Sequence, residues 1–380
     1  MPCHERMGTK SKAPSPGIAG TKQVTQFLVY ARRERKFFLL VSVGLLATAV
    51  FYPYPQVAMW LGFMFAGYSA VANDSIQTIG TFIASNSNRK WYWLWLYIGI
   101  IFIAAILTSW FLYDGDVSFQ RLLSKGLDKP PTEFAFLQVA APLLLLVLTR
   151  LKIPVSTTFM LLTSFSGSLG TITGMLQKST SGYFISFFAS ILIWFLLAKP
   201  IKALVKGKAH EAWVWFQWLT SGFLWYLWIA QDAANVAVYL PRSLSVAQLL
   251  FFIAFIFGGL GLLFYLRGDK IQGIVNEKSD VTDVRSATLI DLVYALILFW
   301  FTQVSTIPMS TTWVFIGLLA GREIGMKAAN YGSGPQKWRK TFKLIGKDIL
   351  YVSFGLLVSM ILAISVNPTI RRELFALLSN

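Results

Sequence analysis

Long apolar segments alternate with short polar connections along nearly the whole chain. The clearest apolar runs cover residues 37–54, 91–113, 133–149, 183–198, 249–266 and 349–366, and several more are interrupted by Gly, Pro or a polar residue. A helix of about 20 apolar residues crosses the hydrocarbon core of a bilayer. The pattern therefore predicts an all-α, polytopic membrane protein embedded in a lipid bilayer. Counting the interrupted runs gives about eleven membrane segments, two of which we allow to be re-entrant.

The charged residues predict how these segments are oriented. The chain of 380 residues has 34 Lys and Arg against 17 Asp and Glu, and the basic residues cluster in short loops beside the apolar runs. Basic loops stay on the cytoplasmic side of a membrane, so this distribution favours cytoplasmic loops over a nucleic-acid-binding surface. We expect a basic, mostly disordered cytoplasmic tail over residues 1–36, a first transmembrane half over 37–198, a basic cytoplasmic linker over 199–210, a second half over 211–366 and a C-terminal tail over 367–380.

Residues typical of enzyme active sites are scarce. The chain has one cysteine, Cys3, and two histidines, His4 and His210, all in hydrophilic stretches. The sequence has no cysteine or histidine cluster of the kind that binds a metal, and no glycine-rich phosphate loop. We therefore predict neither an enzyme nor a resident cofactor.

Two short motifs occur once in each half of the chain. Residues 153–158 read I-P-V-S-T-T and residues 307–312 read I-P-M-S-T-T, 154 positions apart. Upstream of them, residues 72–77 read A-N-D-S-I-Q and residues 230–235 read A-Q-D-A-A-N. By the charge pattern, the first of these aspartate segments runs inward and the second runs outward. Paired segments interrupted by Pro or Gly, in two inverted-topology repeats, are typical of secondary transporters.

The Pro-x-Ser-Thr-Thr segments offer the groups that bind an oxyanion. Proline ends one helix and begins the next, so the hydroxyls lie beside free backbone N–H groups at the positive end of a helix dipole. Two such segments from inverted halves would enclose a tetrahedral anion. The alternative for either segment alone is a proline kink with capping hydroxyls. The predicted anion-binding residues are Ser156, Thr157, Thr158, Ser310, Thr311 and Thr312.

The aspartate segments offer the groups that bind a cation. A carboxylate inside a membrane is costly, and it is therefore usually functional and partnered. Asp74 and Gln77 are three residues apart, as are Asp232 and Asn235, so each pair shares a helix face. Their oxygens suit Na⁺, and the carboxylates suit a proton. A hydrogen-bonded clamp between helices is the alternative. Asp291, in another apolar run, is a further candidate for cation binding or for a polar network.

The four motifs, in this order and at these offsets, resemble those of the inorganic phosphate transporter (PiT) family, which includes sulfate permeases. The resemblance covers roughly residues 60–330. It implies phosphate held between the two Ser-Thr-Thr segments and cations held near the Asp/Asn segments. The chain departs from the family at Phe159 and Trp313, where His commonly follows Ser-Thr-Thr, and these aromatics make the anion site more apolar. The predicted cation-binding residues are Asn73, Asp74, Gln77, Gln231, Asp232, Asn235 and Asp291.

The sequence thus predicts a secondary transporter that carries inorganic phosphate with Na⁺ or H⁺ by alternating access. One alternative is a permease of the same fold for sulfate or another tetrahedral oxyanion. Another is a sensor that binds an anion without transporting it, which the lost His residues and the basic tail favour. A compact chain with short loops fits a bacterial inner membrane, with the N-terminus in the cytoplasm. The long apolar surfaces allow a homodimer.

Overall fold

The computed structural model describes residues 34–123, 126–151, 153, 155–204, 207–266, 283–304, 306–329 and 337–379. The expected N-terminal tail therefore lies almost wholly outside the described residues, and so do Pro154 and the side chain of Gln77. The chain divides into two units, Met1–Ala47 and Thr48–Asn380. The second unit contains all of the predicted binding residues.

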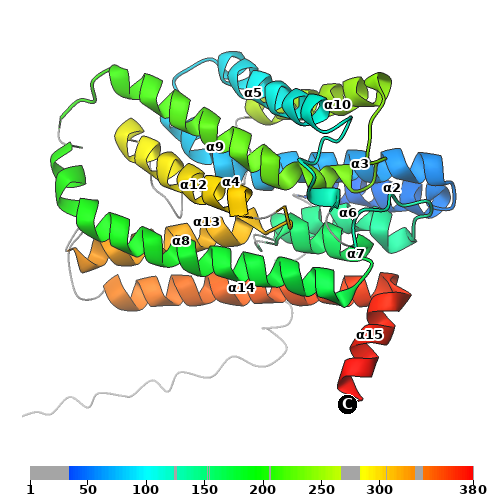
Figure 1. Ribbon diagram of the computed structural model, residues 1–380. Helices are drawn as coiled ribbons and strands as arrows, with labels where there is room; N and C mark the ends of the chain where they lie inside the picture. Colours follow the sequence, from blue (N-terminus) through cyan, green and yellow to red (C-terminus); the bar gives the residue numbers. More distant parts are fainter. Residues whose placement is uncertain are drawn as a thin grey trace, which may run out of the picture. The chain divides into compact units, whose positions relative to one another are not determined.

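The described residues form helices and loops, without a strand. The helices are α2 (Arg35–Phe51), α3 (Pro55–Ala72), α4 (Asp74–Ser85), α5 (Trp91–Leu112), the 3-10 turn η1 (Arg121–Leu123), α6 (Phe136–Arg150), the π-helical turn η2 (Thr158–Leu162), α7 (Thr163–Phe165), α8 (Leu169–Leu204), α9 (Ala212–Ala237), α10 (Val246–Tyr265), α12 (Val284–Val304), α13 (Thr311–Ala328), α14 (Lys337–Val366) and α15 (Pro368–Leu378). Figure 1 shows their arrangement.

Five of the described helices are long and apolar enough to cross a membrane. They are α5, α10 and α12 over their full lengths, the segment Leu169–Leu197 of α8 and the segment Thr341–Val366 of α14. The all-helical class is therefore confirmed, together with several segments suited to a bilayer. The count of about eleven membrane segments stays a prediction.

The proline-containing segments separate helices in both halves. In the first half, α6 ends at Arg150, η2 and α7 follow over Thr158–Phe165, and the helical structure is interrupted again at residues 166–168 before α8. In the second half, α12 ends at Val304 and the continuous helix α13 begins at Thr311. In Figure 1, α6 and α7 lie in the right half of the molecule, whereas α12 and α13 extend towards its left end.

Glycine spacing explains why α13 lies so close to α8. Gly317, Gly321 and Gly325 recur every fourth residue and so form one strip along α13. A Cβ added at Gly321 would collide with the Phe187 carbonyl oxygen of α8, and one at Gly325 would meet the Ile191 carbonyl oxygen at 2.6 Å. Without side chains on this strip, the two backbones approach each other closely, as small residues allow in membrane helix pairs.

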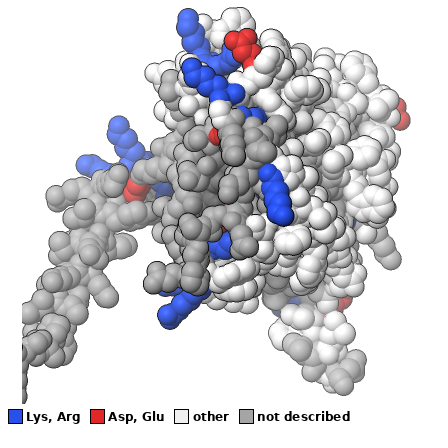
Figure 2. Space-filling view, turned by 90° about the vertical axis from the view of Figure 1, so that its left-hand side faces the viewer, with Lys and Arg blue, Asp and Glu red and all other residues white. Residues whose placement is uncertain are grey.

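Basic residues gather at one end of the second unit. Figure 2 views the end at which α8 terminates and α9, α12 and α14 begin, and Lys and Arg side chains outnumber acidic ones on it. Lys199 and Lys208 are exposed around the end of α8, and Lys343 and Lys347 are exposed early in α14. Basic loops that are far apart in the sequence therefore share one end of the molecule.

Several helices run across the boundaries expected from the sequence. Short helical turns end at Phe165, and the single 36-residue helix α8 includes the apolar run 183–198. Helix α8 also extends into the expected linker 199–210. The expected tail 367–380 contains α15, because the Asn367 side chain accepts hydrogen bonds from the backbone N–H groups of Thr369 and Ile370 and so caps a new helix.

Candidate functional site

The first aspartate lies at a break between two helices. Helix α3 ends at Ala72, Asn73 interrupts it, and Asp74 begins α4. Asp74 is only 2% exposed. The Asn73 amide donates to Asp74 Oδ1 at 2.7 Å, and the Thr157 hydroxyl also donates to the Asp74 carboxylate. The interruption between the two helices therefore falls at the predicted site.

The second aspartate lies within a continuous helix. Asp232 and Asn235 are near the end of α9, and Asn235 Nδ2 donates to Asp232 Oδ1 at 2.5 Å. The Thr311 hydroxyl donates to Asp232 Oδ2 at 2.6 Å. Each aspartate thus accepts a hydrogen bond from the middle residue of the Ser-Thr-Thr segment in its own half. This correspondence extends the sequence repeat to the side-chain contacts.

The two Ser-Thr-Thr segments meet inside the protein. Thr158 Oγ1 donates to the Met309 carbonyl oxygen at 3.1 Å, and Asn235 Nδ2 donates to Thr158 Oγ1 at 3.2 Å. The contact joins residues 151 positions apart. Both turns, Asp232 and Asn235 are therefore held around one buried region.

The serines of the two segments cap the helical turns that follow them. Ser156 Oγ accepts from the Phe159 backbone N–H at 3.2 Å, and Ser310 Oγ accepts from the Trp313 N–H at 3.2 Å. Thr312 is buried, at 2% exposure. The rings of Phe159 and Trp313 contact each other with their centroids 5.3 Å apart. The two aromatic departures from the family pattern therefore form one apolar lid beside the junction of the segments.

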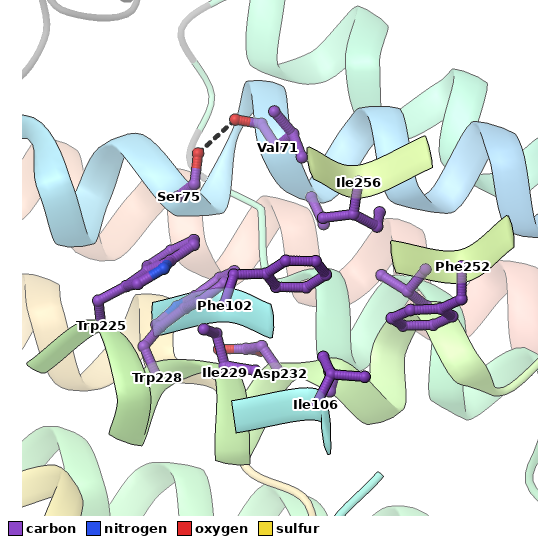
Figure 3. A pocket seen from close by; sticks show the side chains of 13 residues that line it. Val71, Ser75, Phe102, Ile106, Trp225, Trp228, Ile229, Asp232, Phe252 and Ile256 are labelled. Atoms are coloured by element: carbon purple, nitrogen blue, oxygen red, sulfur yellow. Dashed lines mark hydrogen bonds between the residues drawn. The ribbon is translucent and has the colours of Figure 1, made fainter. Parts of the chain in front are cut away.

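The two aspartates are both buried, with Asp74 2% and Asp232 3% exposed. A negative charge on Asp232 makes a charge on Asp74 less favourable. A small, mostly apolar pocket of about 40 Å³ borders Asp232. Figure 3 shows Trp225, Trp228 and Phe102 around it, with the Asp232 side chain among them. Two carboxylates in such a low-dielectric region need a cation or a proton between or beside them.

Polar groups without a protein partner remain in this region. Both amide atoms of Gln231 and Oδ1 of Asn235 are buried and accept or donate no hydrogen bond. Such orphaned groups are rare in folded proteins. Gln231 and Asn235 are four residues apart on α9 and so share one face with free oxygens. Amide, hydroxyl and carboxylate oxygens are suitable ligands for a hard cation.

Asp291 belongs to a different set of contacts. Thr81 Oγ1 donates to Asp291 Oδ1 at 2.7 Å, and the Ser221 hydroxyl donates to Oδ2. The carboxylate therefore joins α12 to α4 and α9. Among the described contacts, it bonds to neither Ser-Thr-Thr segment. This favours the polar-network interpretation of Asp291 over direct cation sharing with the other two aspartates.

Sequence reasoning missed two basic residues beside the site. Arg121 is 3% exposed, its Nε donates to the Ala230 carbonyl oxygen at 2.5 Å, and its charge interacts with Asp232. Lys178 Nζ donates to the Ile307 carbonyl oxygen at 2.6 Å. Arg121 lies in a loop of mixed charge, where nothing in the local pattern distinguishes it. Lys178 lies in a polar interruption that resembles a connection between two helices.

In the part of the chain that the structure describes, no group of three or more His, Cys, Asp or Glu residues is placed to hold a metal ion. No model of a known protein family matches this sequence, and no curated protein matches it. Among solved structures, the chain is similar to "The sodium-dependent phosphate transporter", with a TM-score of 0.49 and 17% sequence identity. The similarity covers 81% of this chain and 98% of that one. A similarity of this size does not transfer a function to this chain.

Proposed function

We propose that this protein is a secondary transporter that carries inorganic phosphate together with a cation, Na⁺ or H⁺. The observation that carries the proposal is the doubled contact of a buried aspartate with the middle hydroxyl of a Ser-Thr-Thr segment, at Thr157–Asp74 and Thr311–Asp232. One carboxylate clamped by a threonine is a common structural feature. Here two related aspartate–threonine pairs come from separate halves of the chain, next to the buried amides of Gln231 and Asn235. Together these groups have the composition of a binding site for ions of both signs.

The cation binds between the two halves in this proposal. Asp232, Asn235 and Gln231 offer oxygens from α9, and Asp74 and Asn73 offer them from the break between α3 and α4. A bound cation would offset the repulsion between the two carboxylates and would satisfy the free amide oxygens. Gln77, whose side chain lies outside the described residues, remains a predicted member of this set.

The anion binds at the junction of the two Ser-Thr-Thr segments. The hydroxyls of Thr157 and Thr311 donate to the carboxylates of Asp74 and Asp232. When cations occupy the carboxylates, these hydroxyls become free to donate to an oxyanion, together with the N–H groups at the start of η2 and α13. Cation and anion binding would thus favour each other, which is the thermodynamic requirement for symport.

We further propose that the halves are inverted repeats that rock about this site, in a chain whose N-terminus faces the cytoplasm of a bacterium. The basic end in Figure 2 supports a cytoplasmic position for that end of the second unit. Cys3 is the only cysteine, so a membrane-impermeant maleimide tests the orientation directly. Labelling in inverted vesicles but not in intact cells is expected. Labelling of Cys3 from outside intact cells would reverse the topology.

The function is tested by uptake of labelled phosphate into liposomes that contain the purified protein. A Na⁺ gradient, a proton gradient and no gradient are compared. Accumulation driven by one gradient establishes symport and identifies the cation. Competition by excess unlabelled sulfate separates a phosphate carrier from the sulfate alternative.

A sensor is the second candidate, because one observation favours it. The Phe159 and Trp313 rings contact each other across the two halves, where the phosphate transporter family that the motifs resemble commonly has His. If this contact keeps the halves from separating, the protein binds the anion and does not release it on the other side of the membrane. Phosphate binding without accumulation under any gradient would establish this alternative. The double variant Phe159→His with Trp313→His would then be expected to restore uptake.

A further inference from the structure

The loop before α6 is built to present Arg121. Phe119 and Gln120, the two residues before it, have φ angles of 53° and 60°. These left-handed conformations are costly for residues other than glycine, and they persist only where surrounding contacts enforce them. The Asp116 carboxylate accepts from the backbone N–H groups of Ser118 at 2.8 Å and of Gln120 at 2.6 Å. Ser109 Oγ accepts from the Phe119 N–H at 3.0 Å.

The strained loop places the guanidinium against helix α9, close to the second aspartate. Arg121 Nε donates to the carbonyl oxygen of Ala230, two residues before Asp232, and the opposite charges of Arg121 and Asp232 attract each other. Asp74 instead has the Asp232 carboxylate as its charged neighbour and accepts from the Thr157 hydroxyl. Among the described residues, the cationic side chain of Arg121 therefore acts on Asp232 and distinguishes it from Asp74.

A second basic residue lies near Arg121. Lys178 is half-buried, and its charge and that of Arg121 repel each other. Its ammonium donates to the Ile307 carbonyl oxygen, and the next residue, Ser179, accepts from the Ser310 N–H at 2.8 Å through its hydroxyl. Arg121 beside α9 and Lys178 beside the second Ser-Thr-Thr segment therefore create a place where an anion relieves repulsion.

We propose that Arg121 is a shared counter-ion, which pairs with Asp232 while the site is empty and turns to the oxyanion when one binds, with Lys178 attracting the anion towards it. This inference rests on the proposed function and adds a coupling device to it. A cation that binds Asp232 releases Arg121 for the anion, and an anion that takes Arg121 exposes Asp232 to the cation. Each ion therefore raises the affinity for the other by the same factor.

Equilibrium binding of labelled inorganic phosphate to the purified, full-length protein tests whether Arg121 binds the anion. Phosphate binding is measured once without Na⁺ and once at saturating Na⁺. Arg121→Gln is expected to weaken phosphate binding about tenfold or more at saturating Na⁺, because a charge-assisted hydrogen bond is lost. Arg121→Lys keeps the charge but loses the planar fork, so about a threefold loss is expected. Lys129→Gln removes an exposed positive charge from the same loop and serves as the matched control. Lys178→Gln is expected to cost about threefold, and less at high salt.

Two outcomes of this measurement overturn the anion role of Arg121. One is phosphate affinity in Arg121→Gln equal to that of Lys129→Gln. The other is that Arg121→Gln and the wild type have the same ratio of phosphate affinity with Na⁺ to phosphate affinity without Na⁺. A shared counter-ion requires this ratio to be smaller in Arg121→Gln. Asp116→Ala tests the loop itself, since it keeps the guanidinium and removes the contacts that hold it. It is expected to weaken phosphate binding more than Lys129→Gln does.

A thermal-unfolding cycle tests the pairing with Asp232 in buffer free of phosphate and Na⁺. Arg121→Gln and Asp232→Asn are measured singly and together. The double variant is expected to lose clearly less in Tm than the two single losses combined, because neither charge is left buried alone. Additive losses refute the pairing, whatever the protein transports.

If Arg121→Gln does not fold, Arg121→Lys replaces it in the cycle. Absence of phosphate binding in the wild type would refute the proposed function instead, and the cycle would still decide the pairing.

Discussion

The two aspartate–threonine clamps have similar chemistry and different backbones. Asp74 lies at an interruption, and its partner Thr157 opens a π-helical turn followed by one short helical turn. Asp232 lies inside the 26-residue helix α9, and its partner Thr311 begins the 18-residue helix α13. Irregular backbone deforms more readily than a regular helix packed on both sides. We therefore expect the first clamp, around Asp74, to change its geometry readily. We expect the second clamp, around Asp232, to keep its geometry.

The surroundings of the clamps differ in the same sense. The second is supported by the glycine strip of α13 against α8 and by Arg121 beside Asp232. The first is supported by Asn73, the neighbouring residue, and by Thr157 across the break. A transporter that binds two kinds of ion benefits from such a division, because one half keeps the geometry of the site while the other responds to occupancy.

The largest effect is expected from removal of either carboxylate. Asp74→Ala and Asp232→Ala should each lower cation-driven phosphate uptake on the order of 100-fold, since each removes the charged ligand of the cation. The variants should differ in stability. Asp232→Ala leaves Arg121 without its carboxylate, so its Tm in detergent should be the lower of the two.

Uptake into liposomes and thermal unfolding of the same preparations provide the two measurements. Asp291→Asn is the comparison variant, because that acid bonds to Thr81 and Ser221 instead of to the clamps. Uptake near the wild-type rate by both alanine variants would remove the aspartates from the mechanism. Equal Tm values would remove the distinction between an adjustable and a fixed clamp.

Gly167 and Gly321 each lie nine residues after the last Thr of a Ser-Thr-Thr segment. The two glycines should respond very differently to substitution by alanine. Gly321→Ala forces a methyl group into the Phe187 carbonyl oxygen, and such overpacking costs about 2–3 kcal/mol. Gly167→Ala places its Cβ at 3.4 Å from the Gly126 carbonyl oxygen, a contact that small shifts accommodate, so a cost below about 1 kcal/mol is expected. Thermal unfolding measures both. A larger loss in Gly167→Ala would mean that the first half, not the second, is the rigid one.

The threonine hydroxyls should matter unequally. Thr157→Val leaves Asp74 with Asn73 as its remaining described hydrogen-bond donor, whereas Thr311→Val leaves Asp232 with Asn235 and the charge of Arg121. Losing a hydrogen bond to a buried charge costs about 1.5–3 kcal/mol, so uptake should fall about tenfold to 100-fold in Thr157→Val. The loss in Thr311→Val should be several times smaller.

Serine replacements at the same positions are the controls, since they keep the hydroxyl. Initial uptake rates at fixed, limiting phosphate give the comparison. Equal losses in Thr157→Val and Thr311→Val would show that Arg121 does not support the second clamp.

Part of this arrangement is predictable from sequence, and the failures have physical causes. The apolar runs 91–113 and 249–266 match α5 and α10 to within a few residues, because burial and lipid contact dominate those segments. The roles that the repeat assigns to the binding residues stay a prediction. The pattern failed at residues 177–182, which resemble a loop but lie inside α8, because their polar groups hold the second turn: Lys178 bonds to Ile307, and Ser179 bonds to Ser310.

The break at Asn73 and the role of Arg121 had no local signal. An Asn within an apolar run is compatible with a continuous helix, and the Thr157 hydroxyl that bonds Asp74 at the break lies 83 positions away. Arg121 is one of several charged residues in its loop, and only the tertiary fold brings it to Ala230, 109 positions away. Contacts of this range determine the site, and neither composition nor periodicity encodes them.

The smallest effect is expected at an acid outside both clamps. Asp283 precedes α12, and a hydrogen bond from the Arg285 guanidinium, at 2.6 Å, lowers the pKa of the Asp283 carboxyl. A lowered pKa in the folded state means that this pair stabilises the fold above the unfolded carboxyl pKa of about 3.9. That stability is lost as the pH falls below it.

Asp283→Asn should therefore cost less than about 1 kcal/mol at neutral pH, as is usual for a partly exposed ion pair. Its Tm should converge with that of the wild type as the pH falls through the lowered, folded-state pKa of Asp283. A gap that widens on acidification would contradict the sign of the pKa shift. A loss of phosphate uptake as large as that of Asp232→Ala would mean that acids at the basic end act on transport as strongly as those in the clamps.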